Sequence, residues 1–256
     1  FDPLGVAYFP ETERYFADMA PNPDYAYIHR PGRHRYGGVD VQINSSGLRG
    51  PEIAPHPAPA APRLVVLGDS IVFGWGADQD ETFPWRLRNL AQGDGIMLEV
   101  VPVGAGSWNT RTEWEFLRKK GAALEADILA LFVVPNDLEP HLDARTDIPK
   151  DQLAPPGTAS STWSRLASRL SQAIVPRSYL LMHVRYFLRT RQAREAEAMT
   201  GADSPKWTDA QLALDGIIHF TRSRGIHLVV FLYGSPADVR QKPVLDLYRR
   251  HLEMRG

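Results

Sequence analysis

Four short apolar runs, separated by segments with helical periodicity, constrain the fold of this chain more than any other feature. The runs cover residues 64–67, 97–103, 128–134 and 226–233, and the helical patterns cover 82–92, 109–120, 209–224 and 236–254. Strands that are apolar along their whole length indicate a parallel sheet with helices on both faces. We therefore predict an α/β fold whose ligand site lies at the carboxyl ends of the strands.

Two segments lie outside this pattern. Residues 1–62 are rich in Pro, Tyr and His, and they end in a stretch, 51–62, that holds five prolines. Only 39–43, where apolar and polar residues alternate, is expected to form a strand there. We predict that 1–62 is a wrapping extension and that 63–256 is one α/β domain. Within that domain, 138–207 is expected to be a mostly helical insertion.

The insertion is locally basic. Residues 158–194 hold seven arginines and no acidic residue. One interpretation is a helical subdomain with a solvated basic face. The other is a lid or an interfacial helix that makes peripheral contact with an anionic surface, such as a membrane or an acidic polysaccharide.

The overall composition excludes several classes of protein. The 29 Lys and Arg residues against 30 Asp and Glu give a net charge of −1, which offers no global electrostatic case for binding nucleic acid. The chain of 256 residues has no cysteine, which excludes disulfides, cysteine-bound metals and thiol nucleophiles. No apolar run approaches the roughly 18 residues that span a bilayer.

The first residue is Phe1, which indicates that the chain was shortened upstream and that a signal peptide or anchor could have preceded it. This start and the basic insertion slightly favour a periplasmic or cell-surface location, and a cytoplasmic one stays open.

The loop after the first apolar run is Gly68-Asp69-Ser70. A serine there can attack an acyl carbon while its own N–H binds the oxyanion. The alternative is an ordinary helix cap, for which Asp and Ser are common. Val72 rules out a Gly-x-Ser-x-Gly nucleophile elbow.

The loops after the second and third runs add possible oxyanion donors. The N–H of Gly106 or Ser107 could face a developing negative charge, and Asn136 offers a side-chain amide. The alternatives are a glycine-rich turn capped by Asn109 or Thr110, and an Asx-turn at Asn136. Because parallel strands end at one edge, we expect Ser70, Ser107 and Asn136 to lie together.

These motifs resemble those of the SGNH (GDSL-like) hydrolase superfamily. Gly68-Asp69-Ser70 matches its first block with Ser70 as nucleophile, 102–110 its second, and Asn136-Asp137 its third with Asn136 in the oxyanion hole. The resemblance covers 44–138 well and 208–256 by architecture. It implies a flavodoxin-like three-layer sandwich and a bacterial serine esterase without metal or organic cofactor.

The sequence departs from this family in two places. The second block usually supplies its donor from a glycine, whereas the alignment puts Ser107 there and Gly106 one residue earlier. The fourth block, Asp-x-x-His, should supply the catalytic base and its acid, and no such pattern follows Tyr233. We expect the base and its acid beyond Gly256, with a last strand and helix, and His141 is the reserve.

Three functions fit these observations. The leading prediction is a serine esterase or acyl hydrolase that cleaves or transfers an acyl group of a small-molecule, lipid or carbohydrate ester, for example an O-acetyl group. The second is a non-catalytic carbohydrate- or anion-binding protein on the same fold. The third is a flavodoxin-like module that holds phosphate at Gly68 to Ser70, which leaves Asn136 unexplained.

Overall fold

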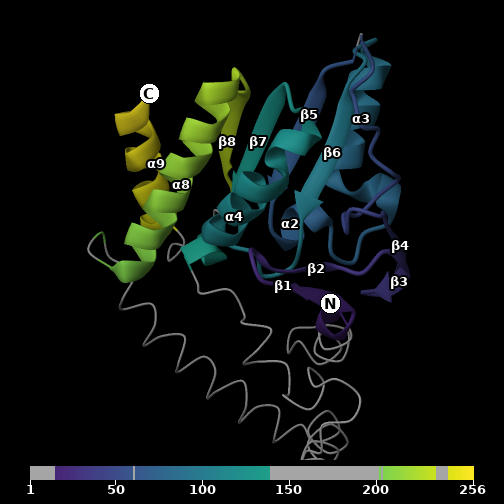
Figure 1. Cartoon of the computed structure of the whole chain (residues 1–256), viewed down its shortest axis with the longest axis horizontal. Helices are drawn as coiled ribbons and strands as arrows, with labels where there is room; N and C mark the ends of the chain where they lie inside the picture. The colour runs from purple at the N-terminus through teal and green to yellow at the C-terminus, as the bar shows by residue number, and fades with distance from the viewer. Residues whose placement is uncertain (1–14, 60, 139–201, 203, 235–241) are drawn as a thin grey trace, which may run out of the picture.

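A four-stranded parallel sheet forms the centre of the protein, whose computed structural model describes residues 15–59, 61–138, 202, 204–234 and 242–256. Across the sheet the strands follow the order β6 (Glu99–Gly104), β5 (Arg63–Gly68), β7 (Ile128–Val133) and β8 (His227–Leu232) (Figure 1). This order of second, first, third and fourth strand is that of a flavodoxin-like sheet. The four predicted strands and the α/β class are confirmed.

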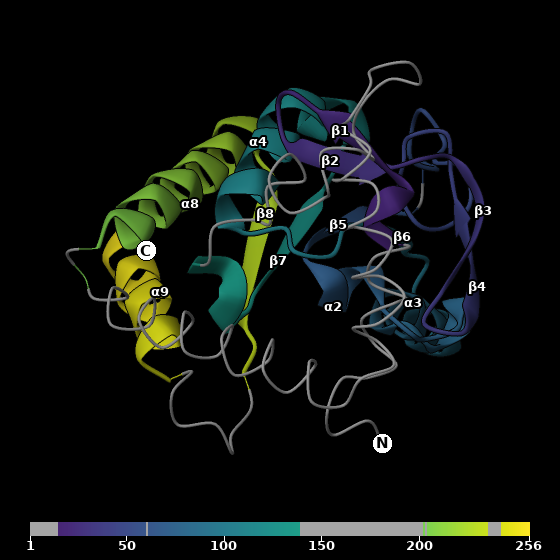
Figure 2. The ribbon, with the colours of Figure 1, turned by 90° about the horizontal axis from the view of Figure 1, so that it is seen from below.

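Helices cover the sheet in two layers (Figure 2). The short helix α2 (Ser70–Phe73) and α3 (Phe83–Gly93) lie toward one face. On the other face lie α4 (Thr110–Lys120), α8 (Pro205–Arg224) and α9 (Lys242–Arg255). Single 3-10 turns, η1 (Gln79–Glu81), η2 (Gly121–Leu124) and η3 (Pro135–Leu138), lie in the connections.

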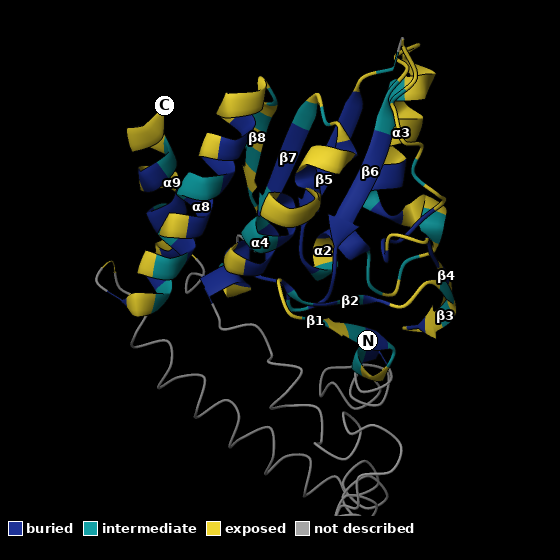
Figure 3. Cartoon of the chain, in the orientation of Figure 1, coloured by how far each residue is buried: buried dark blue, intermediate teal, exposed yellow. Residues whose placement is uncertain are grey.

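Alternate residues of the buried strands build two separate cores. In β5, Val65 and Leu67 pack into the larger core under α4 and α8, whereas Leu64 and Val66 join the smaller core that Phe83 covers. Every residue of β5 is buried, which explains the unbroken apolar run from Leu64 to Leu67 between Arg63 and Gly68 (Figure 3). Each such side chain contributes roughly 1.5–3 kcal/mol by leaving water.

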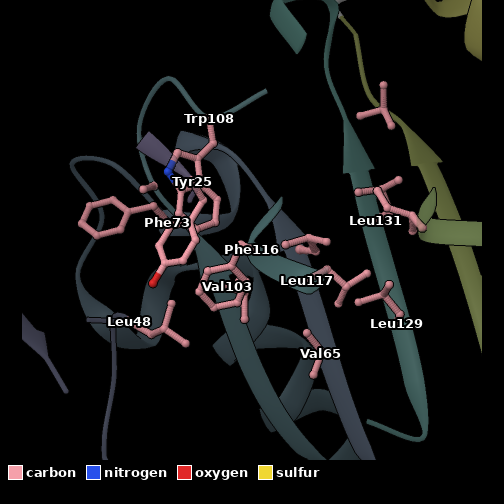
Figure 4. Close-up of a cluster of buried hydrophobic side chains, with 14 of the residues drawn as sticks. Tyr25, Leu48, Val65, Phe73, Val103, Trp108, Phe116, Leu117, Leu129 and Leu131 are labelled. Atoms are coloured by element: carbon pink, nitrogen blue, oxygen red, sulfur yellow. The ribbon is translucent and has the colours of Figure 1, made fainter. Parts of the chain in front are cut away.

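The N-terminal segment forms two antiparallel hairpins, β1 (Met19–Asn22) with β2 (Ala26–His29) and β3 (Gly32–Tyr36) with β4 (Val39–Ile43). The first hairpin runs along the carboxyl edge of the sheet (Figure 1). Figure 4 shows Tyr25 of this segment among the side chains of the larger core, where its ring lies 5.2 Å from that of Phe116. The sequence predicted β4 and missed the other three strands.

Most of α3 is exposed to solvent. Leu87 and Leu90 are 38% and 69% exposed, and the buried residues are Pro84 and Trp85. Only the first turn of the helix is covered by neighbouring elements, so the apolar periodicity further along faces solvent.

Helical cover also stops at the last strand. In β8, Val229 and Phe231 are 43% and 46% exposed, so among the described residues this strand is covered on one face rather than on both as predicted. Most of the predicted insertion lies outside the described residues, including its arginine-rich part and His141, and α8 already begins at Pro205. No helix within the described ranges is long and apolar enough to cross a membrane.

Candidate active site

Three loops meet at the carboxyl edge of the sheet. The register pairs Gly68 at the end of β5 with Gly104 at the end of β6, and Leu67 with Leu131 of β7. A Cβ atom on Gly104 would lie 2.8 Å from the backbone oxygen of Asp69. Glycine at this position therefore lets the first two loops approach each other.

Ser70 is the first residue of α2 and is half-buried. The carboxylate of Asp69 caps this helix, because its Oδ1 accepts a hydrogen bond of 2.9 Å from the N–H of Ile71. The Oγ of Ser70 donates to the other oxygen, Oδ2, over 3.3 Å. Asp69 thus orients both the backbone and the hydroxyl of the predicted nucleophile.

Asn136 reaches the same carboxylate from the third loop. Its Nδ2 donates to Oδ2 of Asp69 over 3.4 Å. The bond that shapes its own turn comes instead from Asp137, whose Oδ2 accepts from the N–H of Val134 over 2.8 Å. The amide of Asn136 is therefore held towards Ser70, and the bond to Asp137 comes from a residue three positions earlier, so it is not the Asx-turn that was the alternative at Asn136.

The second loop distinguishes between the two backbone donors that the sequence left open. The N–H of Gly106 already donates to Oη of Tyr15 over 2.6 Å. Ser107 is half-buried and has a left-handed backbone, with φ at +63°. Such a conformation costs a non-glycine residue about 1–3 kcal/mol and is typical of functional sites. The geometry therefore favours the N–H of Ser107 as the donor.

The alternative interpretation of this loop as a capped turn is also realised. Asn109 caps α4, because its Oδ1 accepts from the N–H of Thr112 over 2.9 Å. The cap lies two residues after Ser107 and fixes the start of the helix at Thr110. The helix cap and the predicted donor Ser107 therefore lie in one segment.

Buried carboxyl groups lie behind the three loops. Burial raises the pKa of Asp69, while hydrogen bonds from Ile71, Asn136 and Ser70 oppose the rise. Asp137 and Glu113 are buried completely, and burial together with the neighbouring carboxylates raises both of their pKa values well above the ordinary range. Glu113 could not be identified from the sequence, because a lone Glu in a charged helix gives no signal.

No described histidine is hydrogen-bonded to Ser70, whose recorded side-chain partner in this part of the chain is Asp69. His251 pairs with Asp215 over 2.8 Å and with Gln211 over 3.2 Å, which ties α9 to α8. His141, the predicted reserve base, lies outside the described residues. The identity of the base stays a prediction.

A surface pocket of about 400 Å³ is lined by Trp85, Arg88 and residues of β6, and it includes none of the three loops above. Among the residues that the structure describes, no group of three or more His, Asp or Glu could hold a metal ion.

Comparison with known proteins gives structural neighbours alone. No family model matches the chain, and no curated protein does. The esterase AlinE4, described as an SGNH-hydrolase family member, is 14% identical with a TM-score of 0.45, over 77% of this chain and 74% of that one. TesA is 12% identical with a TM-score of 0.45, over 75% and 73%. A putative acylhydrolase from Bacteroides fragilis is 13% identical with a TM-score of 0.26, over 78% and 91%.

The structural neighbours are thus SGNH-type esterases and acylhydrolases, the family whose motifs the sequence resembles. At these identities and TM-scores, any statement about the activity of this chain depends on its own residues.

Proposed function

We propose that this protein is a serine hydrolase of ester bonds. Ser70 is the nucleophile, and its Oγ attacks the carbonyl carbon of an acyl ester. The negative charge that develops on the carbonyl oxygen is stabilised by the N–H groups of Ser70 and Ser107 and by the amide of Asn136. The alcohol leaves, and water or another acceptor then takes the acyl group from Ser70.

The observation that carries this proposal is the carboxylate that Ser70 and Asn136 share. Both side chains hydrogen-bond to Oδ2 of Asp69, over 3.3 Å and 3.4 Å, although 66 positions separate them in the chain. A nucleophile and an amide donor held this close can contact one carbonyl group. A phosphate site at Gly68 to Ser70 is disfavoured, since it gives no role to the amide of Asn136, which reaches the same carboxylate.

The reaction needs a general base, because the hydroxyl of Ser70 is a weak nucleophile at neutral pH. We assign that role to a histidine outside the described residues, with His141 as the candidate within the chain. The base takes the proton of Ser70 and returns it to the leaving alkoxide. We infer that the substrate is an ester of a small molecule, a lipid or a carbohydrate, O-acetyl groups included, and that no metal or organic cofactor takes part.

Labelling with a fluorophosphonate tests the proposal, because this probe reacts with activated serines. We expect the full-length native protein, which carries the base, to be labelled and Ser70→Ala in it to abolish the label. Ser46→Ala is the matched control, since Ser46 is exposed in the turn after β4 and should leave labelling unchanged. A chain that is not labelled, or a label that survives Ser70→Ala, overturns the proposal and favours a non-catalytic binding protein.

A series of p-nitrophenyl esters then defines the acyl chain. Preference for acetate over octanoate would favour acetyl esters, and the reverse preference would favour lipid esters. The same Ser70→Ala variant shows whether the measured turnover comes from this site.

A further inference from the structure

Two buried tyrosines of the N-terminal segment hold the residue next to the proposed oxyanion donor. Tyr27 of β2 donates its hydroxyl hydrogen to the backbone oxygen of Gly106. Tyr15 accepts the N–H of the same residue over 2.6 Å. Tyr15 and Tyr27 are 1% and 0% exposed, so water does not compete for either bond.

The bond from Tyr27 acts directly on the proposed donor. The carbonyl of Gly106 and the N–H of Ser107 belong to one planar trans peptide unit, in which they point in opposite directions. A hydroxyl that fixes the carbonyl therefore fixes the N–H as well. It also polarises the peptide unit, which makes the N–H a stronger donor.

The bond from Tyr15 has a defined direction because of His29. The Nδ1 of His29 lies 3.2 Å from the backbone oxygen of Gly47, which can only accept, so Nδ1 carries the hydrogen of the neutral ring. Its Nε2 then accepts from Oη of Tyr15 over 2.8 Å. The hydroxyl of Tyr15 gives its hydrogen to His29 and keeps a lone pair for the N–H of Gly106. Burial lowers the pKa of His29 to about 3, which keeps the ring neutral.

Steric contact reinforces this arrangement. A Cβ atom on Gly106 would lie 2.9 Å from Cε1 of Tyr15, so the ring packs directly on this glycine. Glycine is therefore required here by the ring of Tyr15 in the N-terminal segment.

The geometry points to Tyr27 and Tyr15, with His29 behind Tyr15, as positioning residues that aim the N–H of Ser107 into the oxyanion hole. This inference rests on the proposed esterase function and adds to it that the N-terminal segment is part of the catalytic apparatus. None of the three side chains is assigned contact with the substrate. Their effect passes through one peptide unit.

The kinetics of fluorophosphonate labelling test the inference, because the phosphonyl oxygen occupies the oxyanion hole. Removing a donor outright costs about 10²–10³ in rate, so a misaligned donor should cost about 10–100-fold. We expect Tyr27→Phe to lower the maximal labelling rate by that factor and to leave the concentration for half-maximal rate unchanged. If Tyr27 had a merely structural role, Tyr27→Phe would lower the melting temperature without lowering the maximal labelling rate at an unchanged half-maximal concentration.

Tyr36→Phe is the matched control. Tyr36 is buried in the same aromatic cluster, with its ring centroid 5.0 Å from that of Tyr15, but no recorded bond joins its hydroxyl to Gly106. Tyr15→Phe tests the other side of Gly106 independently and should also lower the maximal rate. Melting curves of all variants show that the chains compared are folded.

The outcomes separate this inference from the proposed function. If Ser70→Ala abolishes labelling and Tyr27→Phe and Tyr15→Phe both match Tyr36→Phe, the positioning role is wrong and the esterase stands. If Ser70→Ala leaves labelling intact, both are wrong. A lower maximal labelling rate of Tyr27→Phe, together with an unchanged rate of Tyr36→Phe, supports the inference.

Discussion

The amide of Asn136 donates to the carboxylate of Asp69 over 3.4 Å, which joins the loop after β7 to the loop after β5. Asp69 is 2% exposed, whereas Asn136 lies at the surface. A buried acceptor thus holds an exposed amide in one orientation. An amide held before the substrate arrives needs no reorganisation during the reaction, which is the condition for strong oxyanion stabilisation.

Replacing Asn136 with alanine should lower activity and leave the fold intact. We expect Asn136→Ala to reduce the rate of fluorophosphonate labelling by about 10²–10³. The free energy of unfolding should change by at most about 0.5 kcal/mol, because the side chain is exposed. Asn89→Ala on the exposed part of α3 is the control. Labelling of Asn136→Ala at the rate of this control would remove Asn136 from the site.

The backbone of Ser107 provides a second test, because its N–H rather than its side chain is the proposed donor. Ser107→Gly should keep the labelling rate within about threefold, since glycine adopts φ at +63° without strain. Ser107→Val should destabilise the fold by about 1–3 kcal/mol, since a β-branched residue is strained there. Urea unfolding and labelling of both variants check this. An inactive, folded Ser107→Gly would show that the hydroxyl is required.

The sequence predicted the sheet because β5, β6 and β7 are buried and therefore almost entirely apolar. It predicted that Ser70 and Asn136 lie close together, because the carboxyl ends of parallel strands must meet at one edge. It missed β3, whose residues Gly32–Tyr36 are mostly polar and show no strand alternation. It also missed the contact of Tyr15 with Gly106, because 91 positions separate them and only the tertiary fold joins them. The abundance of tyrosine in 1–62 was the available signal.

His29 should make the free energy of unfolding depend on pH below neutrality. Its pKa is about 3 in the fold against 6.5 for a free histidine, mainly because of burial, with His34 and Arg49 lowering it further and Gly47 opposing. The neutral ring therefore stabilises the fold above pH 6.5, and this contribution is lost as the pH falls from 6.5 to 3. The slope reaches at most about 1.4 kcal/mol per pH unit.

His29→Gln isolates this contribution. The variant should be less stable than the native chain at pH 7, and the difference should shrink towards pH 4, where the native chain has lost part of its advantage. Urea unfolding at pH 7, 5.5 and 4 measures it. A difference that stays constant with pH would mean that His29 is protonated at the same pH in both states.

Glu113 should make the free energy of unfolding depend on pH in the opposite direction. Both of its carboxyl oxygens are buried without a hydrogen-bond partner among the described residues, and burial with the nearby Asp137 and Asp69 raises its pKa. The folded chain therefore keeps a proton that the unfolded chain releases above about pH 4.5. The contribution of this group to stability is present in acid and is lost as the pH rises towards its folded pKa.

Glu113→Gln removes that loss, because a neutral amide of the same shape has no proton to release. We expect the variant to gain stability relative to the native chain as the pH rises from 5 to 8, measured by urea unfolding. Glu115→Gln, on the same helix but paired with Arg111 and Arg118, should not show this gain. An equal difference at both pH values would mean that Glu113 is ionised in the fold, against the electrostatics of the buried carboxyl cluster.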